Sequence, residues 1–183
     1  MTIEPDTKDW TWVLDRPCPE CGFDTSTVDV TTVGTLVRAN AADWTAVLAR
    51  SDARTRPAVD VWSPLEYACH VRDVFRIFDE RLVLMLTEDH PEFDNWDQDT
   101  SAITDRYGEQ DPDLVATELT AAATALAASF DAVTADQFGR TGRRSDGAEF
   151  TVSSFARYFA HDPVHHLHDV GQERGTTGQL PRA

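Results

Sequence analysis

The sequence has little positive charge and almost no lysine. Lys8 is the only lysine in 183 residues, and 16 basic residues stand against 32 acidic ones, for a net charge of −16 with histidine neutral. Proteins that bind the phosphate backbone of nucleic acids need a basic surface. We therefore expect no nucleic-acid partner. The same negative charge disfavours binding to an anionic membrane surface.

Long apolar runs and a disulfide framework are also missing. The alanine-rich stretch 121–128 is interrupted by Thr124 and falls well short of the roughly 20 apolar residues that span a bilayer. Three cysteines are an odd number and too few for a secreted disulfide scaffold. The first residues are acidic and lack the basic and then apolar order of a secretory signal. We expect a cytoplasmic protein without a membrane segment.

Four segments show the apolar spacing of amphipathic helices, in which side chains recur every three or four residues. Hydrophobic residues make up 41% of the chain, enough for one core. The second segment has the clearest start, because Ser63, Pro64 and Glu66 form a Ser-x-x-Glu capping box with proline in the first turn. The expected helices cover about 26–50, 63–88, 111–134 and 151–173. The sequence therefore predicts an all-α fold, a four-helix bundle.

The remaining segments complete the predicted organisation. Residues 1–25 form an irregular arm, residues 26–175 the bundle, and residues 176–183 a loose tail. The stretch 90–110 reads as a long loop, which in a compact domain is often functional. Before the last helix, the turn signal Ser145-Asp146-Gly147 favours a small β-hairpin.

The last helix carries a stripe of histidines. His161, His165 and His168 stand at i, i+4 and i+7, which places them on one face, while His166 lies off that stripe. Two imidazoles at i and i+4 can bind one cation. A solvated polar helix face explains the same pattern. Pro163 lies between His161 and His165, and we expect it either to kink the helix or to end it so that a new helix starts.

His70 on the second helix shares its face with the apolar Val74, Phe78 and Met85 and should point into the core. A buried histidine must bind or hydrogen-bond something. It could donate to Asp73 three residues later or to a backbone carbonyl. Taken together, His70, His161 and His165 predict a metal site with open positions, built between facing helices. Asp73 and Arg157 would then orient ligands or steady an anion.

Several of these motifs resemble one family. Ser63-Pro64, His70-Val-Arg-Asp73 and His161-Asp-Pro-Val-His165-His166 are similar to motifs of the DinB-like superfamily, which includes mycothiol-dependent maleylpyruvate isomerases and bacillithiol-type thiol transferases. The resemblance covers about 26–172. It implies a four-helix bundle that holds one divalent metal, with one ligand on the second helix and two on the last, which by position are His70, His161 and His165. The arm and the segment around Asp146 resemble an actinobacterial branch of this superfamily.

The arm contains a separate motif, Cys18-Pro-Glu-Cys21-Gly, which resembles one half of a zinc knuckle. A tetrahedral site needs two more ligands, and the sequence has no second Cys-x-x-Cys. Cys18 and Cys21 could hold a second metal, form a redox pair, or lie as thiols packed in a structural turn.

Three functional hypotheses follow. The first is a metal-dependent thiol S-transferase or isomerase, in which Zn²⁺ (or Ni²⁺, Mn²⁺ or Fe²⁺) stabilises the thiolate of mycothiol or a similar small thiol for attack on a small electrophile. Here Arg157 would pair with a carboxylate and Tyr158 would donate a proton. The second is a metal-dependent hydrolase in the same site, and the third a non-catalytic metal-binding stress-response protein. The sequence also allows a homodimer formed through a helix face.

Overall fold

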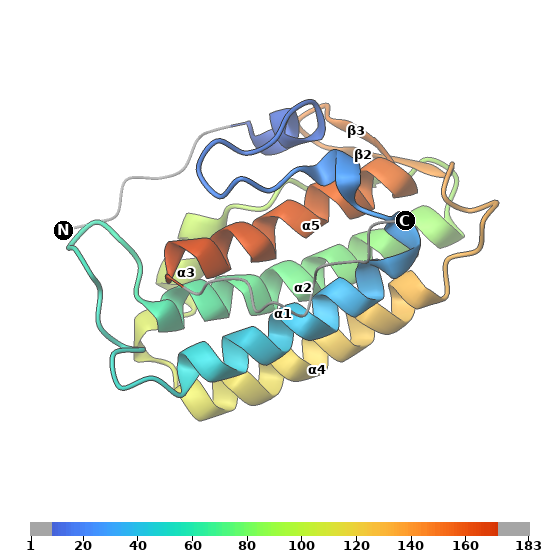
Figure 1. Cartoon of the computed structure of the whole chain (residues 1–183). Coiled ribbons are helices and arrows are strands. Elements are labelled where there is room, and N and C mark those ends of the chain that lie inside the picture. Colours follow the sequence, from blue (N-terminus) through green and yellow to red (C-terminus); the bar gives the residue numbers. More distant parts are fainter. Residues whose placement is uncertain (1–8, 172–183) are drawn as a thin grey trace.

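Four long helices pack into one bundle (Figure 1). A computed structural model describes residues 9–171 of the chain, so the expected tail at 176–183 lies outside the described residues. The long helices are α1 (Val33–Leu48), α2 (Pro64–Thr87), α4 (Pro112–Asp131) and α5 (Val152–Asp169). Helix α4 packs against both α1 and α2, and α5 packs against the same two helices from the other side. The predicted all-α four-helix bundle is confirmed.

The start of α2 matches the sequence prediction. Ser63 accepts from the backbone N–H of Glu66, and the Glu66 carboxylate accepts from the backbone N–H of Ser63, which completes the capping box. The guanidinium of Arg56 pairs with the same carboxylate. Burial would raise the pKa of Glu66, but the hydrogen bonds from Arg56 and Ser63 outweigh it and hold the pKa below its usual value. The preceding loop is thereby fixed to α2.

The first helix begins later than the sequence predicted. Residues Thr25–Thr27 and Val30–Thr32 form separate 3₁₀ turns, and α1 starts at Val33 instead of near 26. Asp24 and Asp29 are the reason, because each side chain accepts a hydrogen bond from a backbone N–H two residues later. Such short-range caps compete with a continuous helix.

A small sheet closes one end of the bundle. Strands β2 (Thr141–Arg144) and β3 (Glu149–Thr151) form the expected hairpin, with Gly147 at φ +98° in its turn. The predicted long loop supplies a third strand, β1 (Glu92–Phe93), which pairs parallel to β2. The same loop contains helix α3 (Gln98–Thr104) and the short turn Tyr107–Glu109.

The N-terminal arm lies across α5 (Figure 1). Its 3₁₀ helix η1 (Trp10–Leu14) buries Val13, and the hydroxyl of Thr25 donates to the Val13 carbonyl at 2.6 Å. Cys18 is also buried, at 1% exposure. Within residues 9–171, no helix combines the length and apolar character that a bilayer crossing requires.

Candidate metal centre

Helix α5 presents two pairs of side chains at helical i, i+4 spacing. His161 and His165 form one pair, and Asp162 and His166 form the second, one residue further along. Consecutive residues in an α-helix point about 100° apart, so the two pairs lie on neighbouring stripes. The structure therefore directs them at different neighbours.

The first group of candidate ligands joins α5 to α2. His70 Nε2 lies 3.4 Å from Asp162 Oδ2, and His166 Nε2 lies 3.8 Å from the same oxygen. The imidazoles of His70 and His166 meet edge to face with ring centroids 4.8 Å apart. One ligand atom from each of the three residues lies within 4.8 Å of the others. Two imidazoles and a carboxylate form a donor set that divalent transition metals accept.

Two polar atoms of this group are buried without a hydrogen-bond partner in the described part of the chain. They are His70 Nδ1 and Asp162 Oδ1. The His70 side chain is only 1% exposed. A buried polar atom without a partner is costly, so the group is not satisfied by the protein alone. A cation bound here would be able to use the unpartnered Oδ1 of Asp162, and a donor set of two imidazoles and one carboxylate fits a metal.

Neighbouring charges set the ionisation of the group. Burial would raise the pKa of Asp162, but its electrostatic interactions with His70 and His166 and its hydrogen bond with His70 outweigh burial and hold the pKa of that carboxyl below its usual range. His166 Nδ1 lies 2.9 Å from Asp169 Oδ2, which leaves Nε2 of His166 facing Asp162. A carboxylate on the far nitrogen is the usual support of a metal-binding histidine.

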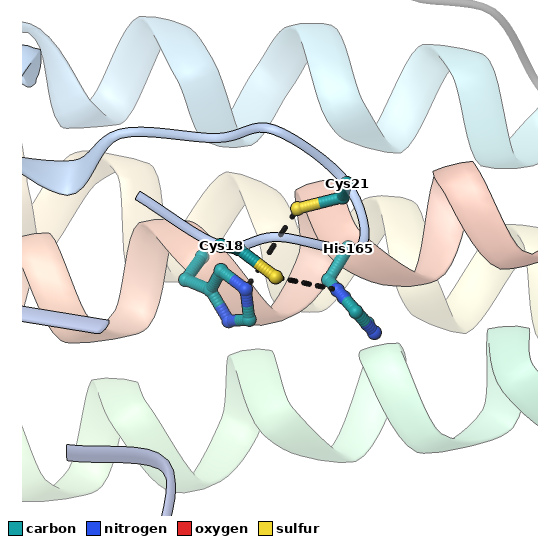
Figure 2. Close-up of side chains that lie close together, drawn as sticks. Cys18, Cys21 and His165 are labelled. Carbon is teal, nitrogen blue, oxygen red and sulfur yellow. Dashed lines mark hydrogen bonds between the residues drawn. The ribbon is translucent and has the colours of Figure 1, made fainter. Parts of the chain in front are cut away.

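The second group lies on the other stripe. Cys18 and Cys21 of the arm meet His161 and His165 of α5, and one ligand atom from each of the four lies within 4.8 Å of the others. Figure 2 shows the two cysteines on the arm with their sulfur atoms turned towards the helix that carries His165. Burial, together with the nearby charge of His165, lowers the pKa of His161 to about 4. Burial also lowers the pKa of His165.

The three predicted ligands are thus divided between two groups. His161 and His165 lie together, as their spacing predicted, but the structure places them with the cysteines, whereas His70 lies with Asp162 and His166. Pro163 does not break the helix, since α5 continues through it to Asp169. The Pro163 carbonyl accepts a hydrogen bond from Asn40 Nδ2 at 2.8 Å. His168 is exposed and belongs to neither group.

Asp73 does not contact His70 in the structure. Its carboxylate accepts from Arg72, Arg76 and the hydroxyl of Tyr107, the last at 2.6 Å. The reason is the direction of the side chain, because Asp73 faces a polar network at the side of α2 that also includes Glu118. The suggested hydrogen bond from His70 to Asp73 is replaced by the contact from His70 to Asp162.

A cavity of about 120 Å³ adjoins the α5 residues of both groups. Tyr158, which the sequence singled out, lines it together with Asp162 and His166, and burial raises the pKa of the Tyr158 phenol. Arg157, also singled out, is not among the lining residues, and its Nε is buried without a partner in the described part of the chain. The arginines that line the cavity are Arg81 and Arg144.

Arg81 is a buried cation, 8% exposed. Its guanidinium donates to the Asp94 carbonyl at 2.6 Å and lies over the rings of Phe78 and Phe93, and no carboxylate of residues 9–171 forms an ion pair with it. Burial and the nearby charge of Arg144 lower the pKa of Arg81 to about 10. Arg144 itself pairs with Asp146 and donates to the Tyr158 hydroxyl at 3.1 Å. The cavity therefore contains a guanidinium without an anionic partner.

Sequence reasoning missed Asp162, His166 and Arg81. Asp162 and His166 have the same i, i+4 spacing as the histidines that were chosen. Arg81 lies on the buried face of α2, where the neighbouring positions carry apolar residues and a charged residue is unusual. The spacing of Asp162 and His166 and the position of Arg81 were therefore the sequence features that could have identified these residues.

Two tryptophans border the cavity. Trp10 comes from the arm, and Trp96 precedes α3. Trp96 also lines a larger cavity of about 620 Å³ with the polar side chains of Arg72, Gln110 and Glu118. Elements outside the bundle therefore form part of the wall of the smaller cavity.

A helical bundle with candidate metal ligands on facing helices is a known class of metal-binding fold. The chain belongs to the DinB superfamily, whose family model matches residues 34–170. Among solved structures, it is similar to YfiT from Bacillus subtilis, described as "a probable metal-dependent hydrolase with an unusual four-helix bundle topology". The two share 18% sequence identity at a TM-score of 0.65 over 93% of each chain, a likeness of fold. No curated protein matches the chain.

Proposed function

We propose that this protein is a metal-dependent enzyme whose metal ligands are His70, Asp162 and His166. The observation that carries the proposal is the meeting of these three side chains from α2 and α5, with two buried polar atoms left without partners. This set differs from the His70, His161 and His165 set expected from the sequence, because His161 and His165 lie with the cysteines of the arm. When bound, a divalent cation would supply a Lewis acid at neutral pH.

The other residues of the cavity have separable roles in this proposal. Asp169 orients His166 through its Nδ1 atom. Arg81, a buried guanidinium without a carboxylate partner, binds an anionic group of the substrate. The Tyr158 hydroxyl, hydrogen-bonded to Arg144, holds a proton near Asp162, since its raised pKa keeps it protonated. Trp10 and Trp96 exclude water.

Within this class we infer transfer of a small thiol, such as mycothiol, to a small electrophile that bears a negative charge. Two features support a reaction of two substrates. The cavity beside Asp162 is small, about 120 Å³, and the larger polar cavity shares Trp96 with it. A hydrophilic thiol suits the larger cavity, because Arg72, Gln110 and Glu118 line it.

The second candidate is a metal-dependent hydrolase that uses the same three ligands. The description of the similar YfiT structure favours it. Ester or amide cleavage needs no second organic substrate, so only the small cavity would be used.

The test begins with metal analysis of the purified chain. Metal-free protein would be reloaded with Zn²⁺, Ni²⁺, Mn²⁺ or Fe²⁺ and assayed with mycothiol and epoxide, halide and activated alkene electrophiles, and separately with esters and amides. Thiol-dependent turnover supports the transferase, and turnover without thiol supports the hydrolase. Metal binding without either activity over these substrate classes counts against an enzyme and favours the non-catalytic metal-binding protein.

Variants then test the ligand set. His70→Ala and His166→Ala should each bind about one equivalent of metal less than the parent and lose the melting-temperature response to chelator that comes from this site. His168→Ala is the matched control, because His168 lies on the same helix and belongs to neither group. If His70→Ala keeps the full metal content and the chelator response, the ligand set is wrong.

A further inference from the structure

The Cys-x-x-Cys motif of the arm finds its missing partners on α5. Cys18 Sγ lies 3.7 Å from His165 Nδ1, and Cys21 Sγ lies 3.8 Å from His161 Nε2. The sequence separation is 147 residues in the first pair and 140 in the second. This long-range pairing supplies the two ligands that the motif lacks when it is read along the sequence.

These separations fit the edges of a tetrahedral zinc site. With Zn–S bonds of about 2.3 Å and Zn–N bonds of about 2.0–2.1 Å at tetrahedral angles, sulfur and nitrogen ligands lie roughly 3.5 Å apart. The two measured pairs exceed this by only a few tenths of an ångström. A thiol donating to an imidazole would explain one pair, but not the convergence of all four ligand atoms within 4.8 Å.

The backbone of the arm is folded to present both sulfur atoms to α5. Cys18 N–H donates to the Phe23 carbonyl at 2.9 Å, and Gly22 N–H donates to the Cys18 carbonyl at 2.8 Å. Gly22 has φ +70°, a left-handed conformation that glycine adopts without strain. The tight turn brings the two cysteines to one side of the loop, as Figure 2 shows.

His165 is oriented as a metal-binding histidine would be. Its Nδ1 faces Cys18, and its Nε2 lies 3.5 Å from a carboxylate oxygen of Glu20 and 3.7 Å from one of Asp169. An acceptor at the far nitrogen fixes the tautomer that leaves the near nitrogen free to bind metal. Asp169 also faces His166 of the other group.

Three of the four side chains are buried, and Cys21 is half-buried. Cys18, His161 and His165 are between 1% and 6% exposed. The indole of Trp10 covers both imidazoles, with ring centroids 5.5 Å from His161 and 5.4 Å from His165. Four protein ligands leave no coordination position for a substrate, which is the pattern of structural rather than catalytic zinc.

We propose that Cys18, Cys21, His161 and His165 bind a structural zinc ion that fastens the N-terminal arm to α5. Binding converts the two thiols to thiolates, and their two protons pass to solvent. The site is separate from the candidate catalytic group of His70, Asp162 and His166, and it does not require that group to hold a metal.

The fastened arm has a consequence for the cavity. Trp10 lines the cavity beside Asp162 and His166, and it belongs to the arm that the cysteines fix. The arm buries few large apolar side chains of its own, chiefly Val13. Zinc binding therefore holds one wall of the cavity in place.

The test uses cobalt in the full-length chain as a spectroscopic substitute for zinc. Thiolate–cobalt(II) charge transfer gives near-ultraviolet absorption that imidazole and carboxylate ligands do not produce, and tetrahedral cobalt gives strong visible bands. We expect both signals in the parent and in His70→Ala, a thiolate band at most about half as strong in Cys18→Ser or Cys21→Ser, and no thiolate band when both cysteines are replaced. Cys69→Ser, which removes the buried thiol beside Gln110, is the control and should keep the band.

Metal content and amide exchange complete the test. Cys18→Ser should bind about one equivalent of zinc less than the parent, and the amides of residues 9–29 should exchange faster. X-ray absorption of the zinc-loaded His70→Ala chain should show two sulfur and two nitrogen ligands, a measurement that does not depend on a cysteine variant folding. A disulfide between Cys18 and Cys21 in the protein as purified, or cobalt binding without a thiolate band, would overturn the proposal.

The two proposals fail separately. Loss of metal from His70→Ala alone concerns the catalytic group, and loss from the cysteine variants alone concerns the structural zinc. An inactive protein that keeps the thiolate band leaves the structural site supported and rejects only the enzymatic proposal.

Discussion

The indole of Trp96 lies almost parallel to the imidazole of His70, with ring centroids 5.2 Å apart and an angle of 11° between the rings. The indole N–H donates to the Ser101 hydroxyl at 2.7 Å, which fixes the ring over His70. His70 is thus covered by a residue of the long loop between α2 and α4, and the same residue lines both cavities.

Replacing Trp96 should therefore loosen both cavities. An aromatic pair is worth about 0.5–1.5 kcal/mol beyond its buried area, so we expect Trp96→Ala to raise KM up to roughly tenfold with a smaller change in kcat. Steady-state kinetics measures this, and Trp96→Phe, which keeps a ring over His70, should recover most of the effect. A purely structural Trp96 would lower the melting temperature and leave KM unchanged.

Arg81→Met tests the anion site. The change removes the buried guanidinium that lacks a carboxylate partner, and methionine can fill much of its volume. A hydrogen bond to a charged group contributes about 1.5–3 kcal/mol, so kcat/KM for an anionic substrate should fall roughly 10- to 100-fold.

The same variant should lose little stability, because replacing a buried charge by an apolar side chain is often neutral or stabilising. Arg143→Met is the control, since Arg143 is exposed on β2 and pairs with Glu92. Equal losses of kcat/KM for neutral and anionic substrates would contradict an anion-binding role for Arg81.

Asp73→Asn should change how stability depends on pH. Burial would raise the pKa of Asp73, but the hydrogen bonds from Arg72 and Tyr107 outweigh burial and lower the pKa below its usual value. A carboxyl with a lowered pKa stabilises the fold above its unfolded pKa of about 3.9, and this contribution is lost as the pH falls through the folded pKa.

The variant should therefore be less stable than the parent at neutral pH, by about 1.5–3 kcal/mol. The difference in the free energy of unfolding should narrow below about pH 4. Urea unfolding at several pH values measures it, with the exposed Asp60→Asn as the control. A difference that stays constant down to acid pH would show that the charge of Asp73 is not responsible.

Gly34→Ala tests the contact between α1 and α4. A Cβ at Gly34 would overlap an Asp131 carboxylate oxygen and would lie 2.8 Å from the Ala127 carbonyl oxygen. The Asp131 side chain can move, but the backbone of α4 cannot without shifting the helix. Overpacking of this kind costs about 1–3 kcal/mol, or roughly 3–10 °C in melting temperature.

Gly139→Ala provides the comparison, because nothing lies within 4 Å of a Cβ built at that position. We expect its melting temperature to stay close to that of the parent. Equal melting temperatures for Gly34→Ala and Gly139→Ala would mean that the two helices can separate freely.

The helices were predictable from the sequence because their signals are local. Apolar spacing and the Ser63–Glu66 capping box located α2 to within a residue at each end. The start of α1 was missed because Asp24 and Asp29 cap short turns, and nothing in the apolar pattern reveals that competition. Strand β1 was missed because it has only two residues and pairs with β2, some fifty residues later.

The candidate sites were predictable only in part. The spacing showed that α5 carries ligand pairs, and His70 was placed on the inner face of α2, where it is buried. Which pair meets His70 depends on the rotation of α5 about its own axis, and a shift of one residue, about 100°, exchanges His161 and His165 for Asp162 and His166. Packing against the arm and α2 sets the rotation of α5, and this rotation cannot be derived from the local pattern of a single sequence.

The interleaving of the two pairs on α5 restricts how this segment can change in evolution. His161 and His165 lie on one stripe of the helix, and Asp162 and His166 lie on the next. Both pairs have the same i, i+4 spacing, and the second pair begins one residue after the first. An insertion or deletion between Asp162 and His165 would break both spacings at once. We expect relatives that keep both ligand groups to keep the length of this interval unchanged, even where its other residues differ.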